Sequence, residues 1–327
     1  MNPSAAVVGA GAIGAWMADA LDRAGWRVSV LARGATLAAL HERGLRLERD
    51  GQERLSHPRA GSASELGLHD YVFLTVKAQA LPELAPTLSP LIGPNTVMVS
   101  GTNGIPWWFF HDFGGLLANH TLRSVDPAGT QERTFPRDRV LGSVVHASAR
   151  VAAPAHVQVV AAERVLVGEP SGADTGRLQE VVTGLRDGGI NAEVSRRIRH
   201  DVWAKLLGNM SMNPLSALTR CGTATMLGSV EVRDLCVRMM QEMQLCAGQL
   251  GLSLGITPQE RIAITQRLGD FRTSMLADLD AGRALELEPQ LGAVVEIADR
   301  LEIPAPFMHA ILGLARLISP APAAGLA

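Results

Sequence analysis

The 327-residue sequence has few of the features that mark secreted or metal-binding proteins. It contains only three cysteines, Cys221, Cys236 and Cys246, with no CxxC pair and no His/Cys cluster at metal-ligand spacing. An odd number of cysteines without close pairing is typical of a reduced, cytoplasmic protein. We therefore expect neither a disulfide framework nor a structural metal.

An excess of charge of one sign is also lacking. The 30 Lys and Arg residues nearly balance the 32 Asp and Glu residues, and the longest basic cluster is the run from Arg196 to Arg199. No apolar run approaches the roughly 18 residues of a membrane-spanning helix, and the N-terminal segment lacks the basic start of a signal peptide. We expect neither a nucleic acid nor a membrane as a partner.

The first motif is a glycine turn close to the N-terminus. A short apolar run, Ser4 to Val8, precedes Gly9, Gly11 and Gly14, and a helical pattern follows from Trp16 to Leu21. This is the G-x-G-x-x-G spacing between a strand and a helix, which suits a tight turn, close approach of a pyrophosphate and helix–strand packing. The pattern predicts a dinucleotide site; a glycine turn without a ligand is the alternative.

Polar residues follow three of the later predicted strands. Arg33 follows the strand from Arg27 to Leu31, where an NAD-binding domain usually carries an acid, and this exchange favours NADP over NAD. Lys77 follows the buried strand from Tyr71 to Val76, and Asn103 follows the strand from Thr96 to Ser100. We expect all three at the cofactor edge of the sheet. A solvated Arg33 and a simple Asn-Gly turn at Asn103 are the alternatives.

The rest of the chain divides into two parts. Up to Ser195 we expect an α/β Rossmann-type dinucleotide-binding domain, residues 1–195, in which residues 80–91 form a helix and residues 157–160 and 165–168 form separate strands. From Arg196 the pattern is helical, which predicts an all-α C-terminal domain, residues 196–327. One helical stripe is expected through Ile264, Leu268, Phe271, Met275 and Leu279. The Pro/Ala-rich tail from 319 to 327 is expected to be disordered, and the aromatic run 107–110 is expected to be packing or a pocket wall.

The stretch from Ile198 to Pro214 carries the clearest candidate for catalysis. On a helix, Lys205, Asn209 and Asn213 fall four residues apart on one face, flanked by bulky apolar residues. A lysine on the wall of a partly buried pocket could protonate or hydrogen-bond a carbonyl oxygen near neutral pH. An ordinary amphipathic helix with a solvated lysine is the alternative.

Polar residues later in the chain have weaker patterns. Ser274 lies four residues before an acid on a predicted helix, and Glu286 and Glu288 precede a long apolar helix. These glutamates could anchor a ligand hydroxyl or simply favour the helix dipole.

Together, these motifs resemble the ketopantoate reductase family, the 2-dehydropantoate 2-reductases. The similarity includes GAGAIG at 9–14, LAR at 31–33, TVKAQ at 75–79 and Asn103-Gly104. It continues through IRHDVWAKLLGNMSMNPLSAL at 198–218, TSMLADLDAGR at 273–283 and LELE at 285–288.

The resemblance implies a cytoplasmic enzyme of pantothenate biosynthesis that reduces a 2-keto acid, ketopantoate, to pantoate with NADPH. It further implies that Lys205 is the general acid and Glu286 its acidic partner. Asn209 and Asn213 would bind the hydroxyl end of the substrate, Ser274 its carboxylate, and Asn103 both substrate and cofactor. Gly9, Gly11, Gly14, Arg33 and Lys77 would bind NADP.

Several positions depart from the family pattern. Leu285 replaces the usual Thr before the active-site Glu, Glu288 replaces an Asp, Phe307 follows Pro306 where a polar residue is common, and the aromatic run 107–110 is bulky. A different 2-keto acid or bulkier ketone is therefore an alternative substrate. A non-catalytic NADP-binding sensor is a third hypothesis, and a homodimer is compatible with the helical stripes.

Overall fold

The computed structural model describes residues 2–320, which form two compact units. The first unit joins Met1–Thr102 to Thr130–Arg199, and the second joins Asn103–Gly129 to His200–Ala327. The tail expected to be disordered lies outside the described residues from position 321 onward.

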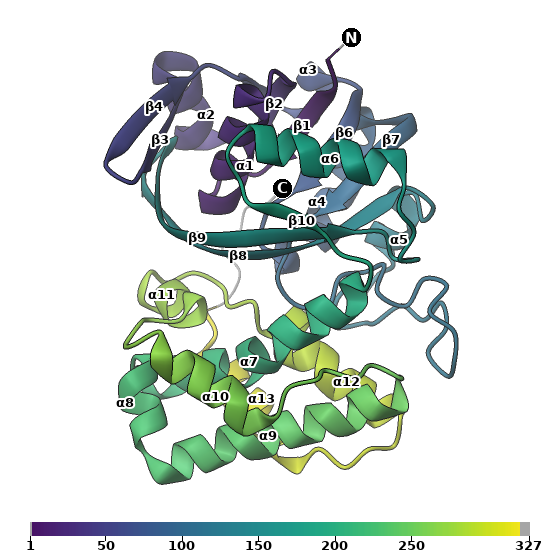
Figure 1. Ribbon diagram of the computed structural model, residues 1–327, viewed down its shortest axis with the longest axis vertical. Helices are drawn as coiled ribbons and strands as arrows, with labels where there is room; N and C mark the ends of the chain where they lie inside the picture. The colour runs from purple at the N-terminus through teal and green to yellow at the C-terminus, as the bar shows by residue number, and fades with distance from the viewer. Residues whose placement is uncertain (1, 321–327) are drawn as a thin grey trace. The chain divides into compact units, whose positions relative to one another are not determined.

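The first unit is built on a ten-stranded mixed sheet (Figure 1). Six neighbouring strands run parallel in the order β5-β2-β1-β6-β7-β8. Their bounds are β5 Arg59–Gly61, β2 Arg27–Leu31, β1 Ser4–Val8, β6 His69–Leu74, β7 Ile92–Ser100 and β8 Val140–Ala153. β1 is buried along its whole length, as expected for a parallel strand covered on both faces.

The sheet continues through a long antiparallel hairpin. β8 pairs with β9 (His156–Gly168), which pairs with β3 (Leu45–Arg49) and with β10 (Ala192–Val194); β4 (Gln52–Ser56) forms the edge beside β3. The prediction of separate strands at 157–160 and 165–168 was wrong. The two apolar runs are one strand because pairing with β8 continues through irregularities near Ala147 and Ala149.

Helices cover the sheet of this unit. α1 (Ala12–Arg23) and α6 (Gly176–Asp187) pack against each other. The other helices of this unit are α2 (Gly34–Arg43), α3 (Ala63–Leu66), α4 (Leu81–Leu84) and α5 (Thr130–Thr134). The helix expected over 80–91 is instead broken into η1 (Ala78–Ala80), α4 (Leu81–Leu84) and η2 (Ala85–Leu91). Pro86 and Pro90 lack the backbone N–H that a continuous α-helix requires, which explains the break.

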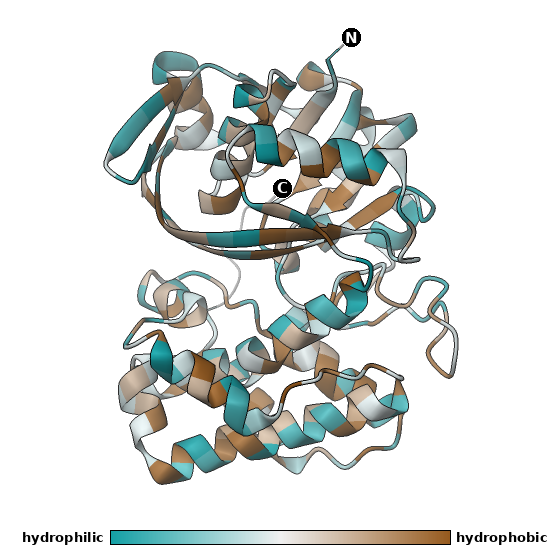
Figure 2. Cartoon of the chain, viewed as in Figure 1, coloured by the Kyte–Doolittle hydropathy of each residue, from teal (hydrophilic) through white to brown (hydrophobic). Residues whose placement is uncertain are grey.

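The second unit is helical. Its elements are α7 (Ile198–Thr219, which begins in the first unit), α8 (Thr223–Gly228), α9 (Val230–Gln249), α10 (Pro258–Arg267), α11 (Ser274–Asp280), the π-helix η3 (Glu288–Gly292), α12 (Ala293–Arg300) and α13 (Pro306–Ile318). α9 contacts α8, α10, α12 and α13. Figure 2 shows polar and apolar residues alternating along α9, whose buried face includes Met239, Met243 and Cys246.

The stripe expected from Ile264 to Leu279 does not exist as one helix face. α10 ends at Arg267, and Leu268 and Phe271 are exposed. The helix ends because Gly269 has a φ of 77°, a conformation that terminates α-helices. Asp270 then accepts a hydrogen bond from the Ala224 backbone N–H at the start of α8.

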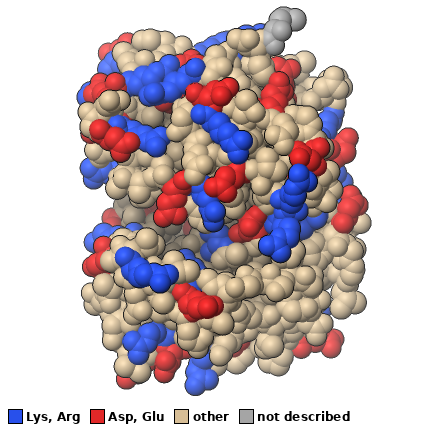
Figure 3. Space-filling model, viewed as in Figure 1, with Lys and Arg blue, Asp and Glu red and all other residues tan. Residues whose placement is uncertain are grey.

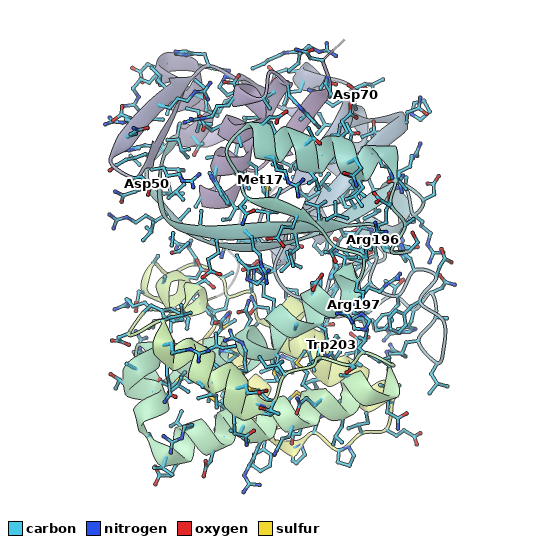
Figure 4. The ribbon with its side chains drawn as sticks, viewed as in Figure 1. Met17, Asp50, Asp70, Arg196, Arg197 and Trp203 are labelled. Carbon is cyan, nitrogen blue, oxygen red and sulfur yellow. The ribbon has the colours of Figure 1, made fainter. Side chains whose placement is uncertain are left out.

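The segment from 103 to 129 belongs to the helical unit. Its aromatic residues at 107–110 are all buried, and the Phe109 ring lies 5.8 Å from the ring of Trp203. Trp203 lies on α7 (Figure 4). Such aromatic pairs stabilise a core by about 0.5–1.5 kcal/mol beyond area burial. The aromatic run is therefore packing within this unit.

Residues 2–320 contain neither a membrane-spanning helix nor a cluster of metal ligands. No helix in this range is both long and apolar enough to cross a bilayer, and no group of three or more His, Cys, Asp or Glu residues there could hold a metal ion. On the face shown in Figure 3, acidic and basic side chains of the first unit are interspersed.

Candidate functional site

In the first unit, the carboxyl ends of three parallel strands meet at one edge of the sheet. Val8 at the end of β1 is in register with Leu31 of β2 and with Leu74 of β6. The residues that follow these strands therefore emerge side by side, which is where open α/β sheets bind ligands. Gly9, Arg33 and Lys77 all follow strands that end at this edge.

The glycine turn at this edge has the geometry of a phosphate-binding turn. Gly9 has a φ of 99°, which favours glycine. A Cβ atom on Gly14 would lie 2.0 Å from the Gly9 carbonyl oxygen and 2.4 Å from Thr75 Oγ1, so only glycine lets α1 approach this closely. A Cβ on Gly11 would meet nothing within 4 Å, which leaves its outer side open.

The start of α1 can accept an anion. Its N-cap residue, Gly11, offers no side-chain hydrogen bond, and the first turn contains no acidic residue. The backbone N–H groups of a helix start attract negative charge when no side chain satisfies them. These features fit the pyrophosphate of a dinucleotide.

Arg33 and Lys77 both have exposed side chains at the same edge. Arg33 is the N-cap residue of α2, and its side chain forms no ion pair with another described residue. An exposed guanidinium in this position can form a bidentate contact with a phosphate. Lys77 is the N-cap residue of η1, shortly after the end of β6.

In the second unit, Lys205 meets a residue 102 positions earlier in the chain. Its Nζ donates a hydrogen bond of 2.8 Å to Asn103 Oδ1. Burial lowers the pKa of Lys205 from its usual value to about 8, and the negative charge of Glu286 opposes this change. Glu286 is itself buried, with 3% of its surface exposed. The structure thus brings together Lys205, Asn103 and Glu286.

The backbone around Gly104 holds Asn103 in place. Gly104 has a φ of 86°, and the Ile105 N–H donates a hydrogen bond of 2.8 Å to the Pro289 carbonyl oxygen of η3. A Cβ on Gly104 would lie 2.3 Å from this oxygen. The Asn103-Gly104 sequence therefore does more than make a turn, because it seats the loop against the π-helix.

The other two members of the α7 stripe differ in their surroundings. Asn213 is buried, and its Nδ2 donates a hydrogen bond of 3.1 Å to Gln290 Oε1. Asn209 is half-buried, and its side chain makes no hydrogen bond to another described residue. Asn209 is therefore available to a ligand, whereas Asn213 is already bound to the π-helix.

Gln290 was not among the site residues predicted from the sequence. It is 1% exposed, and its Nε2 has no hydrogen-bond partner in the described part of the chain. Its signal was a polar residue inside an apolar helical stripe, directly before Leu291. π-helical turns occur frequently at functional sites, and an unsatisfied buried amide is a candidate ligand contact.

The remaining predicted residues differ from this cluster in their contacts. Ser274 is the exposed first residue of α11, whose start is capped by Thr273. Glu288 forms an ion pair with Arg316 at 2.8 Å, so its charge is used within the unit. Phe307 packs beneath the guanidinium of Arg238, 5.3 Å from its ring centre.

The arrangement can supply a proton to a developing oxyanion. An ammonium with a pKa near 8 is charged at neutral pH yet gives up its proton more readily than an ordinary lysine. A half-buried amide, Asn209, and the Gln290 Nε2 add hydrogen-bond donors in the same unit. This combination suits reduction of a carbonyl group.

Comparison with known proteins places these features in a family. Residues 5–172 match the family model of ketopantoate reductase PanE/ApbA, and residues 197–319 match the model of its C-terminal part. A 2-dehydropantoate 2-reductase from Mesorhizobium japonicum is 39% identical over 315 residues, which cover 96% of this chain and 97% of the relative.

Solved structures support the same family. A ketopantoate reductase-like protein from Ralstonia solanacearum has a TM-score of 0.92 at 38% identity, over 97% of this chain and 98% of that chain. A dimeric ketopantoate reductase from Staphylococcus aureus has a TM-score of 0.74 at 19% identity, over 96% and 98% of the two chains, and shows the shared fold. The chain is an oxidoreductase, and it belongs to the ketopantoate reductase family.

Proposed function

We propose that the protein reduces ketopantoate to pantoate with NADPH, in pantothenate biosynthesis, and that Lys205 is its proton donor. The observation that carries this proposal is the lysine itself. The Lys205 ammonium donates a hydrogen bond to Asn103. Burial lowers the pKa of Lys205 to about 8, and the negative charge of Glu286 opposes this change. A lysine that only solubilises a helix needs none of these features.

Ketopantoate reductases use NADPH, and the chain uses the same cofactor. When bound, NADPH supplies the hydride that reduces the ketone. The glycine turn would hold its pyrophosphate at the start of α1, through Gly9, Gly11 and Gly14. Arg33 would bind the 2′-phosphate, with Lys77 beside it at the same edge.

Lys205 acts on the oxygen of the ketone. As the carbonyl carbon gains the hydride, negative charge develops on this oxygen, and the Lys205 ammonium neutralises it by giving a proton. Stabilisation that grows with the developing charge accelerates the reaction more than binding of the neutral ketone does. Glu286 keeps Lys205 protonated at neutral pH, because its charge raises the lysine pKa.

The other residues would orient the substrate. Asn103 would fix the direction of the Lys205 ammonium and also contact the cofactor. Asn209 would form a hydrogen bond with the hydroxyl end of the keto acid. Asn213 would act with Gln290, to which it is hydrogen-bonded at 3.1 Å. The Ser274 hydroxyl would contact the substrate carboxylate.

We also propose that the boundary between the dinucleotide-binding and helical domains lies at Ser195, that the protein is cytoplasmic and that it forms a homodimer. The three cysteines are free, in accord with a reducing compartment. Leu245 on α9 and Leu314 and Leu317 on α13 are exposed apolar side chains that a second copy could cover. Light scattering will measure the mass in solution, and a monomer at micromolar concentration would contradict the dimer.

A panel of keto acids tests the proposed reaction. The purified protein is assayed for NADPH oxidation with ketopantoate, with other branched 2-keto acids and with bulkier aromatic 2-keto acids. We expect the highest kcat/KM for ketopantoate. A far higher kcat/KM for another ketone would support the same reaction on a different substrate. Tight NADPH binding without oxidation by any keto acid would support a sensor and contradict the proposal.

A further inference from the structure

Arg261 on α10 lies against the helix that carries Lys205. A Cβ atom on Gly208 would come within 2.4 Å of Arg261 Nη2, 2.6 Å of Nε and 2.7 Å of Cζ. The guanidinium is therefore seated flat against the backbone of α7 at Gly208. Gly208 lies one helical turn from Lys205 and directly before Asn209.

The guanidinium has very little to balance its charge. Its Nη1 donates a hydrogen bond of 2.9 Å to the hydroxyl of Thr265, which is 1% exposed. It forms no ion pair with any carboxylate in residues 2–320. The nearest acid in the sequence, Glu260, is engaged at the helix start, where it accepts hydrogen bonds from Thr257.

Such a cation is unusual inside a protein. Burial lowers the pKa of Arg261 below its usual value, and no neighbouring charge compensates for the lost hydration. Buried charges are normally paired because an unpaired one is costly. A partly buried guanidinium with a single hydroxyl partner is therefore suited to a negatively charged ligand.

Gly208 provides the space for this guanidinium. It is the only glycine among the 22 residues of α7, and glycine inside a helix costs about 1 kcal/mol relative to alanine. An alanine would force the guanidinium to move, since its Cβ would lie within 2.4 Å of Nη2. α7 thus carries a residue of low helix propensity at the position that Arg261 contacts.

We propose that Arg261 binds the carboxylate of the 2-keto acid and gives the enzyme its preference for acids over neutral ketones. This inference rests on the proposed function and deepens it. In a 2-keto acid the carboxylate is bonded directly to the ketone carbon. Side chains one turn apart on a helix lie about 5–6 Å apart, and the Arg261 guanidinium lies at the Gly208 position, one turn after Lys205 on α7. In the proposed complex the carboxylate meets Arg261 and the ketone oxygen meets Lys205.

The chemistry of the carboxylate and of the ketone supports this division of roles between Arg261 and Lys205. A guanidinium offers a planar pair of N–H donors that match a carboxylate, and it stays charged at every working pH. The single hydroxyl of Ser274 can donate one hydrogen bond but cannot neutralise a charge. Arg261 therefore supplies the positive charge that the rest of the predicted substrate site lacks beyond Lys205.

The test compares a charged and a neutral substrate of nearly the same shape. A branched 2-keto acid, 3-methyl-2-oxobutanoate, and its methyl ester are each assayed with NADPH for their kcat/KM values. The proteins compared are the wild type, Arg261→Met, Arg261→Lys and Arg267→Met. Arg267 is exposed on the same helix and serves as the matched control. Melting temperatures and NADPH affinity are recorded for each variant.

We expect the wild type and Arg267→Met to prefer the acid by about 10- to 100-fold, in line with a charge-assisted hydrogen bond to an otherwise unpaired group. In Arg261→Met this ratio should collapse toward one through a higher KM for the acid, and Arg261→Lys should recover part of it. An unchanged ratio in Arg261→Met, including an equal loss for acid and ester, would overturn the proposal.

A second readout separates this inference from the proposed reaction. Oxamate, a carboxylate-bearing analogue of a 2-keto acid, is titrated calorimetrically into the NADPH-bound protein. If the wild type reduces no keto acid, the proposed function fails, but tight oxamate binding that Arg261→Met loses would still support a carboxylate site. Equal oxamate binding by the two proteins, or none by the wild type, would contradict it.

Discussion

The charge of Glu286 should control the pH range in which the enzyme works. Lys205 must be protonated to act as a donor, so the rate of reduction should fall as the pH rises through its pKa, about 8. Burial lowers this pKa, and Glu286 raises it. Replacing the carboxylate in Glu286→Gln removes the opposing effect, so the pKa of Lys205 should fall further and the alkaline limb should move to lower pH.

The size of the effect follows from the titration. An opposite charge within a few ångströms changes a pKa by about 1–3 units, and we take about 1 unit as the smallest change. At about pH 8.5 the protonated fraction of Lys205 would then fall from about 24% to about 3%, an eightfold loss of rate of roughly 1.2 kcal/mol. At about pH 6 both proteins would be more than about 90% protonated, so the pH-dependent part of the loss would vanish.

The assay is the initial rate of NADPH oxidation with saturating ketopantoate, from about pH 6 to about pH 10 at constant ionic strength. Glu288→Gln is the matched control, because Glu288 pairs with Arg316 and not with Lys205. Its alkaline limb should coincide with that of the wild type. An alkaline limb that stays in place in Glu286→Gln, or moves to higher pH, would refute the electrostatic role of Glu286.

Three further substitutions test the binding geometry. Arg33→Ala should weaken NADPH binding about 10- to 100-fold and leave NADH binding nearly unchanged; equal losses, measured by fluorescence titration, would remove the 2′-phosphate role. Gly14→Ala should lower the melting temperature and abolish NADPH binding, because its Cβ would lie 2.0 Å from the Gly9 oxygen; a stable protein with normal affinity would contradict the close packing of α1. Gly104→Ala should reduce kcat with little change in NADPH affinity, because the strained loop would displace Asn103 from Lys205; unchanged kcat would show that this hydrogen bond is dispensable.

Local patterns predicted the parts of the site that depend on neighbouring residues. The G-x-G-x-x-G spacing predicts the turn because each glycine meets a steric requirement within the same short segment. The structure shows this requirement at Gly9 and Gly14, where a Cβ atom would come too close to its neighbours. The four-residue spacing likewise places Lys205, Asn209 and Asn213 on one face of α7. Fixed helical geometry is sufficient for such a prediction.

Contacts between distant segments could not be predicted in this way. The hydrogen bond between Asn213 and Gln290 joins residues 77 positions apart. The seating of Arg261 on Gly208 likewise depends on how α10 packs against α7. The stripe expected from Ile264 failed for a local reason, since Gly269, with a φ of 77°, ends the helical region that apolar spacing alone would continue.

The turnover number of Lys205→Met with ketopantoate and NADPH tests the central claim most directly. Circular dichroism and NADPH affinity, compared with the wild type, will verify that the variant is folded and binds the cofactor. We predict a kcat about 10²- to 10⁴-fold below that of the wild type, the range expected when a general acid is lost. A folded variant that binds NADPH and turns over at the wild-type rate would contradict the assignment of Lys205 as the proton donor.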